Sequence, residues 1–304
     1  MTSSFKADVI VFGGTAPGLV AAIRAAREGL TVRLLTPSSK LGGALPSLGA
    51  LETHYRGVRS PLLKELGDML CNYYRNTYGE DSRQYHECHS GMMLTFEPRV
   101  MEKLLNDWIS AEARIHAHTQ TRLVSASRKH GRLESIQACE ITSGREFKFE
   151  GRFFVEASYE GDLMAMAGVS HRLGREARDE FDEPSAGTVF TRWIPGEFPR
   201  AAAMGRLNLV TAKATTTDPI SESTGEGDDN IQSYSFRLCI TNNPSNRLLL
   251  GSPPSSYDRS IYAPLLLTPE EKERLSLPFH HRFLIYSLSE MIERDHLFHG
   301  HALP

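Results

Sequence analysis

The sequence is poor in cysteine and has no C-x-x-C pair. Its 304 residues contain four widely spaced cysteines, Cys71, Cys88, Cys139 and Cys239. This pattern argues against a disulfide-stapled secreted domain or a zinc ribbon and favours free thiols in a reducing compartment. The sequence also lacks an apolar run of about 18 residues and a basic segment ahead of an apolar core at its start. We therefore expect a cytoplasmic protein with no membrane partner.

An excess of positive charge is missing as well. The chain has 34 Lys and Arg against 37 Asp and Glu, a formal net charge of −3. A nucleic-acid partner is therefore not expected, because such partners require a basic surface. Hydrophobic residues make up 40% of the chain, which is enough to bury a large core in one or two domains.

The most informative stretch that is present lies at residues 8–37. The apolar run 9–12 is too short for a helix and stops at Gly13 and Gly14, which predicts a buried parallel strand. An alanine-rich segment over residues 19–26 predicts a helix that ends near Gly29, and residues 31–35 predict the second strand. Such a βαβ unit places the pyrophosphate of a dinucleotide at the start of its helix.

The turn of this unit departs from the usual G-x-G-x-x-G fingerprint at one position. Gly13 allows the tight turn, Gly18 lets the helix pack closely on the strand, and Pro17 suits the first helical turn. The middle glycine is replaced by Thr15, so we expect the backbone to approach the phosphates with a side chain present. A domain of this fold that binds no nucleotide is the alternative reading.

A second departure lies at the end of the returning strand. The acid that usually binds the ribose hydroxyls is replaced by Thr36, and the only cation nearby is Lys40. We expect adenosine to bind here with reduced affinity, and the choice between cofactors stays open at this point. Residues 38–57 are rich in Gly, Ser and Pro and predict a loop, in which Gly42 and Gly43 let the backbone pass close to a cofactor.

The order of the later elements separates two cofactor classes. Residues 61–78 and a segment opened by Pro98 predict helices, and residues 92–96 predict a short strand. A strand, a β-meander with turns at Gly131 and Gly144, and a buried strand over residues 153–157 follow. In a plain nicotinamide-binding domain the third strand follows within roughly 30 residues. Here about 75 residues of loop and helices separate the second strand from the return to the sheet, so this order favours a flavin-binding oxidoreductase over a plain nicotinamide-dependent dehydrogenase.

Several motifs then resemble one known family. GGTAPG, SKLGG, SLGALETHYRGVRSPLLKE, GMMLTFEP and EASYEGDLMAMAGV are similar to motifs of the FAD-dependent oxidoreductase family whose bacterial members are often labelled xanthan lyase-like. The resemblance runs from about residue 8 to 262, with Glu156 and Ser158 standing where the family usually has Asp and Thr. Members of that family are longer, so the resemblance implies a C-terminally shortened member.

The resemblance implies an α/β fold with a Rossmann-like, glutathione-reductase-type FAD-binding domain, an inserted β-meander and a sheet-rich substrate domain. The expected boundaries are 1–168 for the FAD domain, with a helical insertion at about 61–112, then 169–262 for the substrate domain and 263–304 for a helical tail. By position, the turn holds the pyrophosphate, Gly42 and Gly43 line the cofactor, Val124 offers backbone to the adenine, and Ala157 and Ser158 end a strand beneath the flavin side.

Candidate catalytic residues are harder to assign. His54, Tyr55 and Arg237 either face a flavin or substrate or are simply solvated. Glu160 and Asp162 either contact the ribityl hydroxyls or cap a helix over residues 163–167. The histidine-rich stretch at residues 85–89 and the five histidines of the tail lack a complete ligand set, so no metal is expected.

These features together predict an FAD-dependent flavoprotein that transfers a hydride from a small organic substrate to the flavin. Two alternatives stay open: a truncated, catalytically inactive Rossmann remnant that acts as a binding module, and an NAD(P)-dependent dehydrogenase. The amphipathic tail is expected to cover a sheet edge or to mediate a homodimer.

Overall fold

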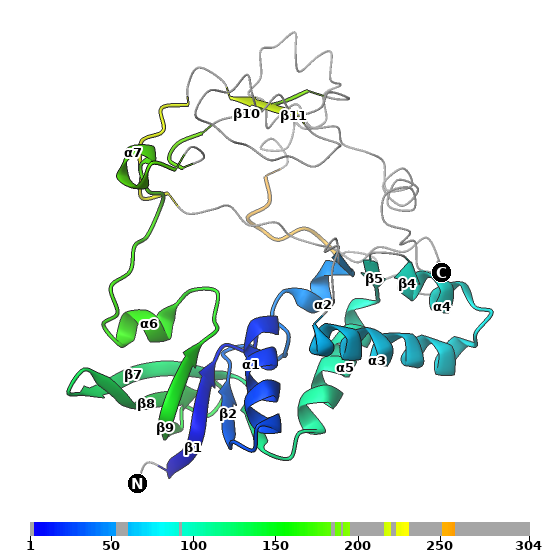
Figure 1. Cartoon of the computed structure of the whole chain (residues 1–304), viewed down its shortest axis with the longest axis horizontal. Coiled ribbons are helices and arrows are strands. Elements are labelled where there is room, and N and C mark those ends of the chain that lie inside the picture. The colour runs from blue at the N-terminus through cyan, green and yellow to red at the C-terminus, as the bar shows by residue number, and fades with distance from the viewer. Residues whose placement is uncertain are drawn as a thin grey trace. The chain divides into compact units, whose positions relative to one another are not determined.

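The computed structural model describes residues 3–52, 60–90, 93–183, 186–189, 191–194, 216–219, 223–230 and 251–258. The chain divides into two compact units, with described residues up to Ser170 in the first and those from His171 onward in the second. The first unit contains the six-stranded sheet and its helices, and Figure 1 shows both. Within the described residues, no helix combines the length and apolar character needed to cross a membrane.

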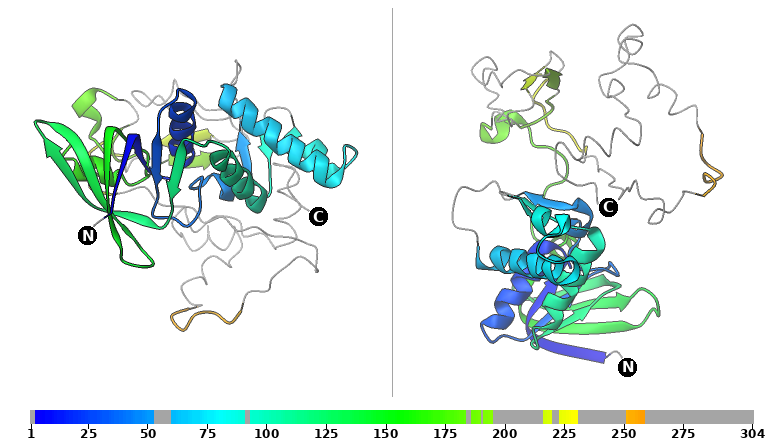
Figure 2. Two further views of the ribbon diagram at one scale, coloured as in Figure 1. Left: turned by 90° about the horizontal axis from the view of Figure 1, so that it is seen from below. Right: turned by 90° about the vertical axis from the view of Figure 1, so that its right-hand side faces the viewer.

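A six-stranded sheet forms the centre of the first unit, in the order β6-β2-β1-β9-β8-β7 (Figures 1 and 2). Four of its strands run parallel, namely β1 (Ser3–Phe12), β2 (Val32–Leu35), β6 (Ile115–His118) and β9 (Glu146–Glu156). The remaining two, β7 (Thr121–Lys129) and β8 (Arg132–Glu140), are antiparallel and complete a meander with β9. This arrangement confirms the predicted Rossmann-like sheet with an inserted meander.

The predicted βαβ unit is present at the start of the chain. Residues 9–12 of β1 are buried, and Phe12 is paired with Leu35 of β2 and with Glu156 of β9. The carboxyl ends of these three strands therefore lie at one edge of the sheet. Helix α1 (Ala16–Arg27) connects β1 to β2 and packs its buried face into the core through Leu19, Ala22, Ile23 and Ala26.

Two longer helices pack into the same core. Helix α3 (Pro61–Tyr78) matches the predicted range and is capped by Ser60, whose Oγ accepts the N–H of Leu63 at 3.2 Å. Helix α5 (Pro98–Ser110) also begins with a proline, whose missing N–H costs nothing in the first helical turn. Fully buried side chains from the two helices, including Leu70 and Met101, each contribute about 1.5–3 kcal/mol by leaving water.

The prediction of a loop over residues 38–57 is wrong in part. This segment contains α2 (Leu45–Leu48) and β3 (Ala50–Glu52), separated by Gly49 at φ +70°. β3 pairs with β5 (Met93–Thr95). β5 also pairs with β4 (His89–Ser90), the strand that directly follows helix α4 (Arg83–Cys88). The strand was missed because its partner lies about 40 residues further along the chain, beyond the range of local sequence patterns. Strand β5 itself confirms the strand predicted at residues 92–96.

The turns of the meander lie where the sequence predicts them, but its last strand is less buried than predicted. Gly131 and Gly144 both have positive φ, +77° and +72°, at the two turns. The strand expected to be buried at residues 153–157 begins with Phe153, which is 56% exposed. β8 pairs with β9 only over residues 146–150, so on that side the following residues have no strand beside them in the described part of the chain.

The second unit contains α7 (Arg178–Phe181) and an antiparallel pair, β10 (Thr191–Ile194) and β11 (Thr216–Pro219). The segments GTVFTRWI (187–194), LNLVTAKA (207–214) and IQSYSFRLCIT (231–241) predict strands, and the polar, turn-rich run 215–230 predicts a loop. Strand β10 agrees with the first of these strands, whereas β11 falls in the predicted loop, so the loop prediction is wrong for these four residues. The other two predicted strands and the helical tail lie outside the described residues.

Candidate functional site

The turn between β1 and α1 requires glycine because other backbone atoms occupy the space that a Cβ atom would need. Gly13 has φ +116°, and a Cβ there would overlap the carbonyl carbon of Ala157 at the end of β9. A Cβ at Gly18 would overlap the carbonyl oxygen of Gly13. The N–H of Gly13 donates to the carbonyl of Leu35 at 2.8 Å, which fixes the turn against β2. These contacts agree with the packing roles expected for both glycines.

Thr15 has a structural role that the sequence reading missed. Its side chain is only 5% exposed, and its Oγ1 accepts the N–H of Gly18 at 3.3 Å as the N-cap of α1. The same hydroxyl donates to the carbonyl oxygen of Ala157 at 2.6 Å. The threonine that replaces the middle glycine therefore caps the helix and ties its start to β9.

Thr36 lies directly against the glycine turn. It is 5% exposed, and a Cβ on Gly14 would lie 2.8 Å from the Cβ of Thr36. Its Oγ1 accepts the N–H of Ser38 at 3.3 Å. Lys40, the cation expected nearby, has its Nζ 2.7 Å from a carboxylate oxygen of Glu102 on α5. The ammonium group is therefore already paired within the protein.

The second glycine segment reaches the same turn. Thr15 and Gly42 form an isolated parallel bridge, and the N–H of Gly42 donates to the carbonyl of Gly14 at 2.6 Å. Gly42 and Gly43 both have positive φ, +98° and +59°. A Cβ on Gly42 would overlap Leu105 of α5, so this position also requires glycine. Two segments separated by more than 20 residues thus form one surface.

Tyr159 joins a third segment to this surface. Its phenol oxygen accepts the N–H of Ala44 at 2.8 Å, and a Cβ on Gly43 would overlap that oxygen. Tyr159 is 63% exposed. Tyr159 belongs to the EASYEGDL motif, but no sequence pattern assigns it a role. The one sequence feature that could have indicated a role for Tyr159 is its position directly after Ser158.

The acid that caps the next helix also differs from the expected ones. The carboxylate of Glu156 accepts the N–H groups of Ser158 and Leu163 at 2.6 Å each, and that of Met164 at 3.2 Å. Helix α6 (Asp162–Met166) has Gly161 as its N-cap residue, with no cap bond from its own side chain. The capping proposed for Glu160 or Asp162 is therefore supplied by Glu156, from the end of β9.

The remaining expected site residues differ in their placement. Val124 lies on β7, which begins where the N–H of Thr121 donates to the carbonyl of Thr36 at 2.8 Å. The structure thus gathers the glycine turn, Thr36, the second glycine segment, Ala157 and Ser158, with Val124 three residues into the adjoining strand. His54, Tyr55 and Arg237 lie outside the described residues.

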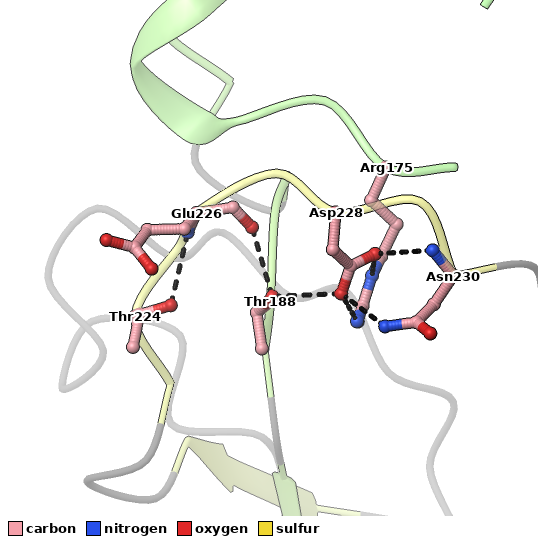
Figure 3. Close-up of polar contacts among 6 residues, drawn as sticks. All are labelled: Arg175, Thr188, Thr224, Glu226, Asp228 and Asn230. Carbon is pink, nitrogen blue, oxygen red and sulfur yellow. Dashed lines mark hydrogen bonds and ion pairs between the residues drawn. The ribbon is translucent and has the colours of Figure 1, made fainter. Parts of the chain in front are cut away.

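A separate polar cluster lies in the second unit (Figure 3). The carboxylate of Asp228 accepts from Arg175 Nε at 2.9 Å and from the side-chain amide of Asn230 at 2.8 Å. Thr188 donates to the carbonyl of Glu226 at 3.0 Å and adds a long contact of 3.4 Å to Asp228. The Arg175 guanidinium holds the pKa of the Asp228 carboxyl well below its usual range. These groups satisfy one another, so the cluster ties loop segments together.

The charge-rich sequence stretch that contains Arg172, Arg175, Glu176 and Arg178 predicts a solvated or ion-paired surface. Arg172 pairs with Glu180, and Arg175 pairs with Asp228. The reading is confirmed for both residues. Among the residues that the structure describes, no three His, Cys, Asp or Glu side chains gather in a way that could hold a metal ion.

The start of α1 is electrostatically suited to a dinucleotide phosphate. Its first turn has no acidic side chain, and the end of a 12-residue helix carries about half a positive charge. Pro17, Gly43 and Ala44 are exposed, so the rim of the turn is open to solvent. Backbone amides, a helix start and adjacent glycines are the donor set that a pyrophosphate requires. The residues present therefore fit a dinucleotide cofactor.

A comparison with family models decides which dinucleotide. The model described as FAD dependent oxidoreductase matches residues 8–280. The chain belongs to this family. The resemblance stated from the sequence motifs is thereby confirmed, and the cofactor of this FAD-dependent oxidoreductase is FAD. No curated protein sequence matches the chain.

Solved structures resemble parts of the chain at low identity. A geranylgeranyl bacteriochlorophyll reductase-like protein from Thermoplasma acidophilum shares 13% identity over 55% of this chain and 43% of that chain, with a TM-score of 0.39. The quinol fumarate reductase FrdA of E. coli shares 16% over 66% and 41%, with a TM-score of 0.39. The p-nitrophenol 4-monooxygenase of Pseudomonas putida shares 9% over 58% and 47%, with a TM-score of 0.38. The chain spans less than half the length of these structures.

Proposed function

We propose that this FAD-dependent oxidoreductase binds FAD at the α1 turn and takes a hydride from a small organic substrate. The observation that carries the proposal is the convergence of three segments, residues 13–18, 42–44 and 157–159, at the start of one helix. Family membership supports the cofactor, and the geometry of this turn supports its location.

Within this proposal, the residues have distinct roles. The backbone around Gly13, Gly14, Thr15 and Gly18 holds the pyrophosphate at the positive end of α1, with Pro17 shaping the first helical turn. Thr36 lies nearest the ribose and Lys40 at the edge of that region. Gly42 and Gly43 line the cofactor because they have no side chains, Val124 offers its backbone to the adenine, and Ala157 and Ser158 lie toward the flavin side.

Bound FAD supplies the redox chemistry, and the protein orients the substrate and controls protons. We assign substrate contact to His54, Tyr55 and Arg237, whose side chains can hold or transfer a proton or bind an anion. The proposal retains a substrate domain over residues 169–262, a tail at 263–304 that pairs two copies, and a cytoplasmic location.

The first experiment measures cofactor content. Purified protein is expected to absorb near 450 nm with about one flavin per chain, and added FAD is expected to raise the Tm of any apoprotein. A colourless protein whose Tm does not respond to FAD would instead support the inactive-remnant alternative. A Tm that responds to NAD(P) and not to FAD would support the nicotinamide-dependent alternative.

A matched pair of glycine variants then tests the location. Gly43→Ala and Gly144→Ala both place a Cβ at a positive φ, so both carry similar backbone strain. Only Gly43 lies at the proposed site, whereas the added Cβ at Gly144 meets nothing within 4 Å. Gly43→Ala is expected to weaken FAD binding at least tenfold, and Gly144→Ala to leave it unchanged. Equal effects of the two variants would place the cofactor elsewhere.

A further inference from the structure

Two cysteines on consecutive helices meet in the helical layer of the first unit. Cys71 lies on α3 and Cys88 is the last residue of α4, and their Sγ atoms are 3.4 Å apart. A short turn that begins at Gly79 separates the two helices (Figure 1). Scattered spacing in the sequence gave no sign of this contact.

The two thiols differ in their surroundings. Cys88 is 1% exposed, and its Sγ also lies 3.1 Å from the carbonyl oxygen of Tyr85. Cys71 is only partly buried, so a reagent in solution reaches it first. Burial, followed by the neighbouring Cys71, raises the pKa of the Cys88 thiol well above its usual range. Attack by Cys88 is consequently slow near neutral pH, because only the thiolate is nucleophilic.

We propose that Cys71 and Cys88 are a reversible disulfide site that a low-molecular-weight disulfide such as oxidised glutathione closes. The Cys71 thiolate attacks one sulfur of the oxidised glutathione, forming a mixed disulfide and releasing one glutathione thiolate. Cys88 then loses its proton and attacks Cys71 Sγ, which forms the internal disulfide and releases the second glutathione thiolate. Two protein thiols are oxidised, and one glutathione disulfide is reduced to two thiols.

The geometry favours the internal bond over a lasting mixed disulfide. A disulfide has an S–S distance of about 2.05 Å. Starting from 3.4 Å, the two sulfur atoms need to approach each other by about 1.3 Å. Both cysteines lie on helices that are joined by a short turn, so this approach is a local adjustment. The bond would join α3 to the segment that enters β4, and so link the helical layer to the small sheet.

Oxidation of the full-length protein with oxidised glutathione tests the proposal. Peptide mapping by mass spectrometry is expected to find a Cys71–Cys88 peptide that weighs about 2 Da less than its two reduced parts, and dithiothreitol is expected to reverse it. The oxidised protein is expected to have a Tm higher by roughly 5 °C, because the bond restricts the unfolded chain. The rate at which Cys88 closes the internal bond is expected to rise about tenfold for each pH unit between pH 7 and 9, because the fraction of Cys88 thiolate rises by that factor.

Three variants separate this site from the other thiols. Cys88→Ala is expected to stop at a glutathione adduct on Cys71, and Cys71→Ser to give neither adduct nor bond at this place. A Cys139→Ala, Cys239→Ala double variant is expected to close the bond at the normal rate. A wild-type protein that carries only a Cys71 adduct after prolonged treatment at pH 9, or that pairs Cys71 with Cys139 or Cys239, would overturn the proposal.

Discussion

Replacing Glu156 by alanine is expected to loosen the segment between β9 and α6. The carboxylate accepts three backbone N–H groups, from Ser158, Leu163 and Met164. Losing a helix N-cap acceptor costs about 0.5–2 kcal/mol, and the bond to Ser158 adds about 1 kcal/mol. Because Glu156 is only partly buried and water replaces some of these bonds, we expect Glu156→Ala to lower the free energy of unfolding by about 2 kcal/mol.

Chemical denaturation and thermal unfolding measure this loss. A change of about 2 kcal/mol corresponds to a fall in Tm of roughly 4–8 °C for a unit of this size. Glu156→Gln keeps one acceptor oxygen and is expected to lose about half as much. Glu160→Ala is the matched control, because Glu160 is an exposed acid in the same segment and makes none of these bonds.

Hydrogen exchange locates the effect. The amides of Leu163 and Met164 are expected to exchange faster in Glu156→Ala than in the native protein, because their acceptor is gone. The reasoning is wrong if Glu160→Ala destabilises as much as Glu156→Ala, or if the exchange of these two amides is unchanged.

Four further outcomes follow from the contacts. Arg27→Met removes ion pairs to Glu65 and Glu112 at 2.7 and 2.6 Å and is expected to cost about 1–2 kcal/mol in urea denaturation, with a smaller loss at high salt. Gly18→Ala is expected to unfold the first unit in circular dichroism, because its Cβ would overlap the backbone of the turn. Tyr159→Phe removes the acceptor for Ala44 and is expected to weaken FAD binding several-fold in titration, with little change in Tm. Burial, with Arg33 nearby, lowers the pKa of His118 to about 4. The unfolded chain takes up this proton near pH 6.5 and the folded chain only near pH 4, so this contribution to stability is complete above pH 6.5 and is lost as the pH falls toward 4. The full shift corresponds to about 3 kcal/mol, and we expect a loss of about 2 kcal/mol because the imidazole is partly exposed. His118→Phe is expected to reduce this loss in pH-dependent unfolding.

The elements that sequence reasoning predicted well are those with local causes. Helix α3 was predictable because Ser60 caps it, Pro61 starts it, and apolar residues repeat at helical spacing. The turns of the meander were predictable because Gly131 and Gly144 adopt positive φ. In each case the deciding interactions fall within one helical turn or one hairpin, which is the range that a sequence pattern covers.

The features that were missed depend on contacts between distant residues. Strand β3 exists because β5 pairs with it, and three residues carry too little periodicity to indicate a strand. Glu156 reaches seven residues ahead to cap α6, whereas Glu160 and Asp162 stand where a local reading places the cap. The bond from Ala44 to Tyr159 spans 115 positions. None of these pairings follows from the spacing of residues along the chain.

The glycines of the first turn and those of the second segment carry different information about function. Added side chains at Gly13, Gly14 and Gly18 would each meet atoms of this protein, so these glycines are required by the fold whether or not a cofactor is bound. Gly43 differs because the three atoms nearest its added Cβ all belong to the exposed side chain of Tyr159, which can move aside. Glycine at position 43 is therefore not explained by packing alone. If FAD binds at this turn as proposed, a substitution at Gly43 should affect cofactor binding more than stability, because the atoms nearest its added Cβ belong to an exposed side chain.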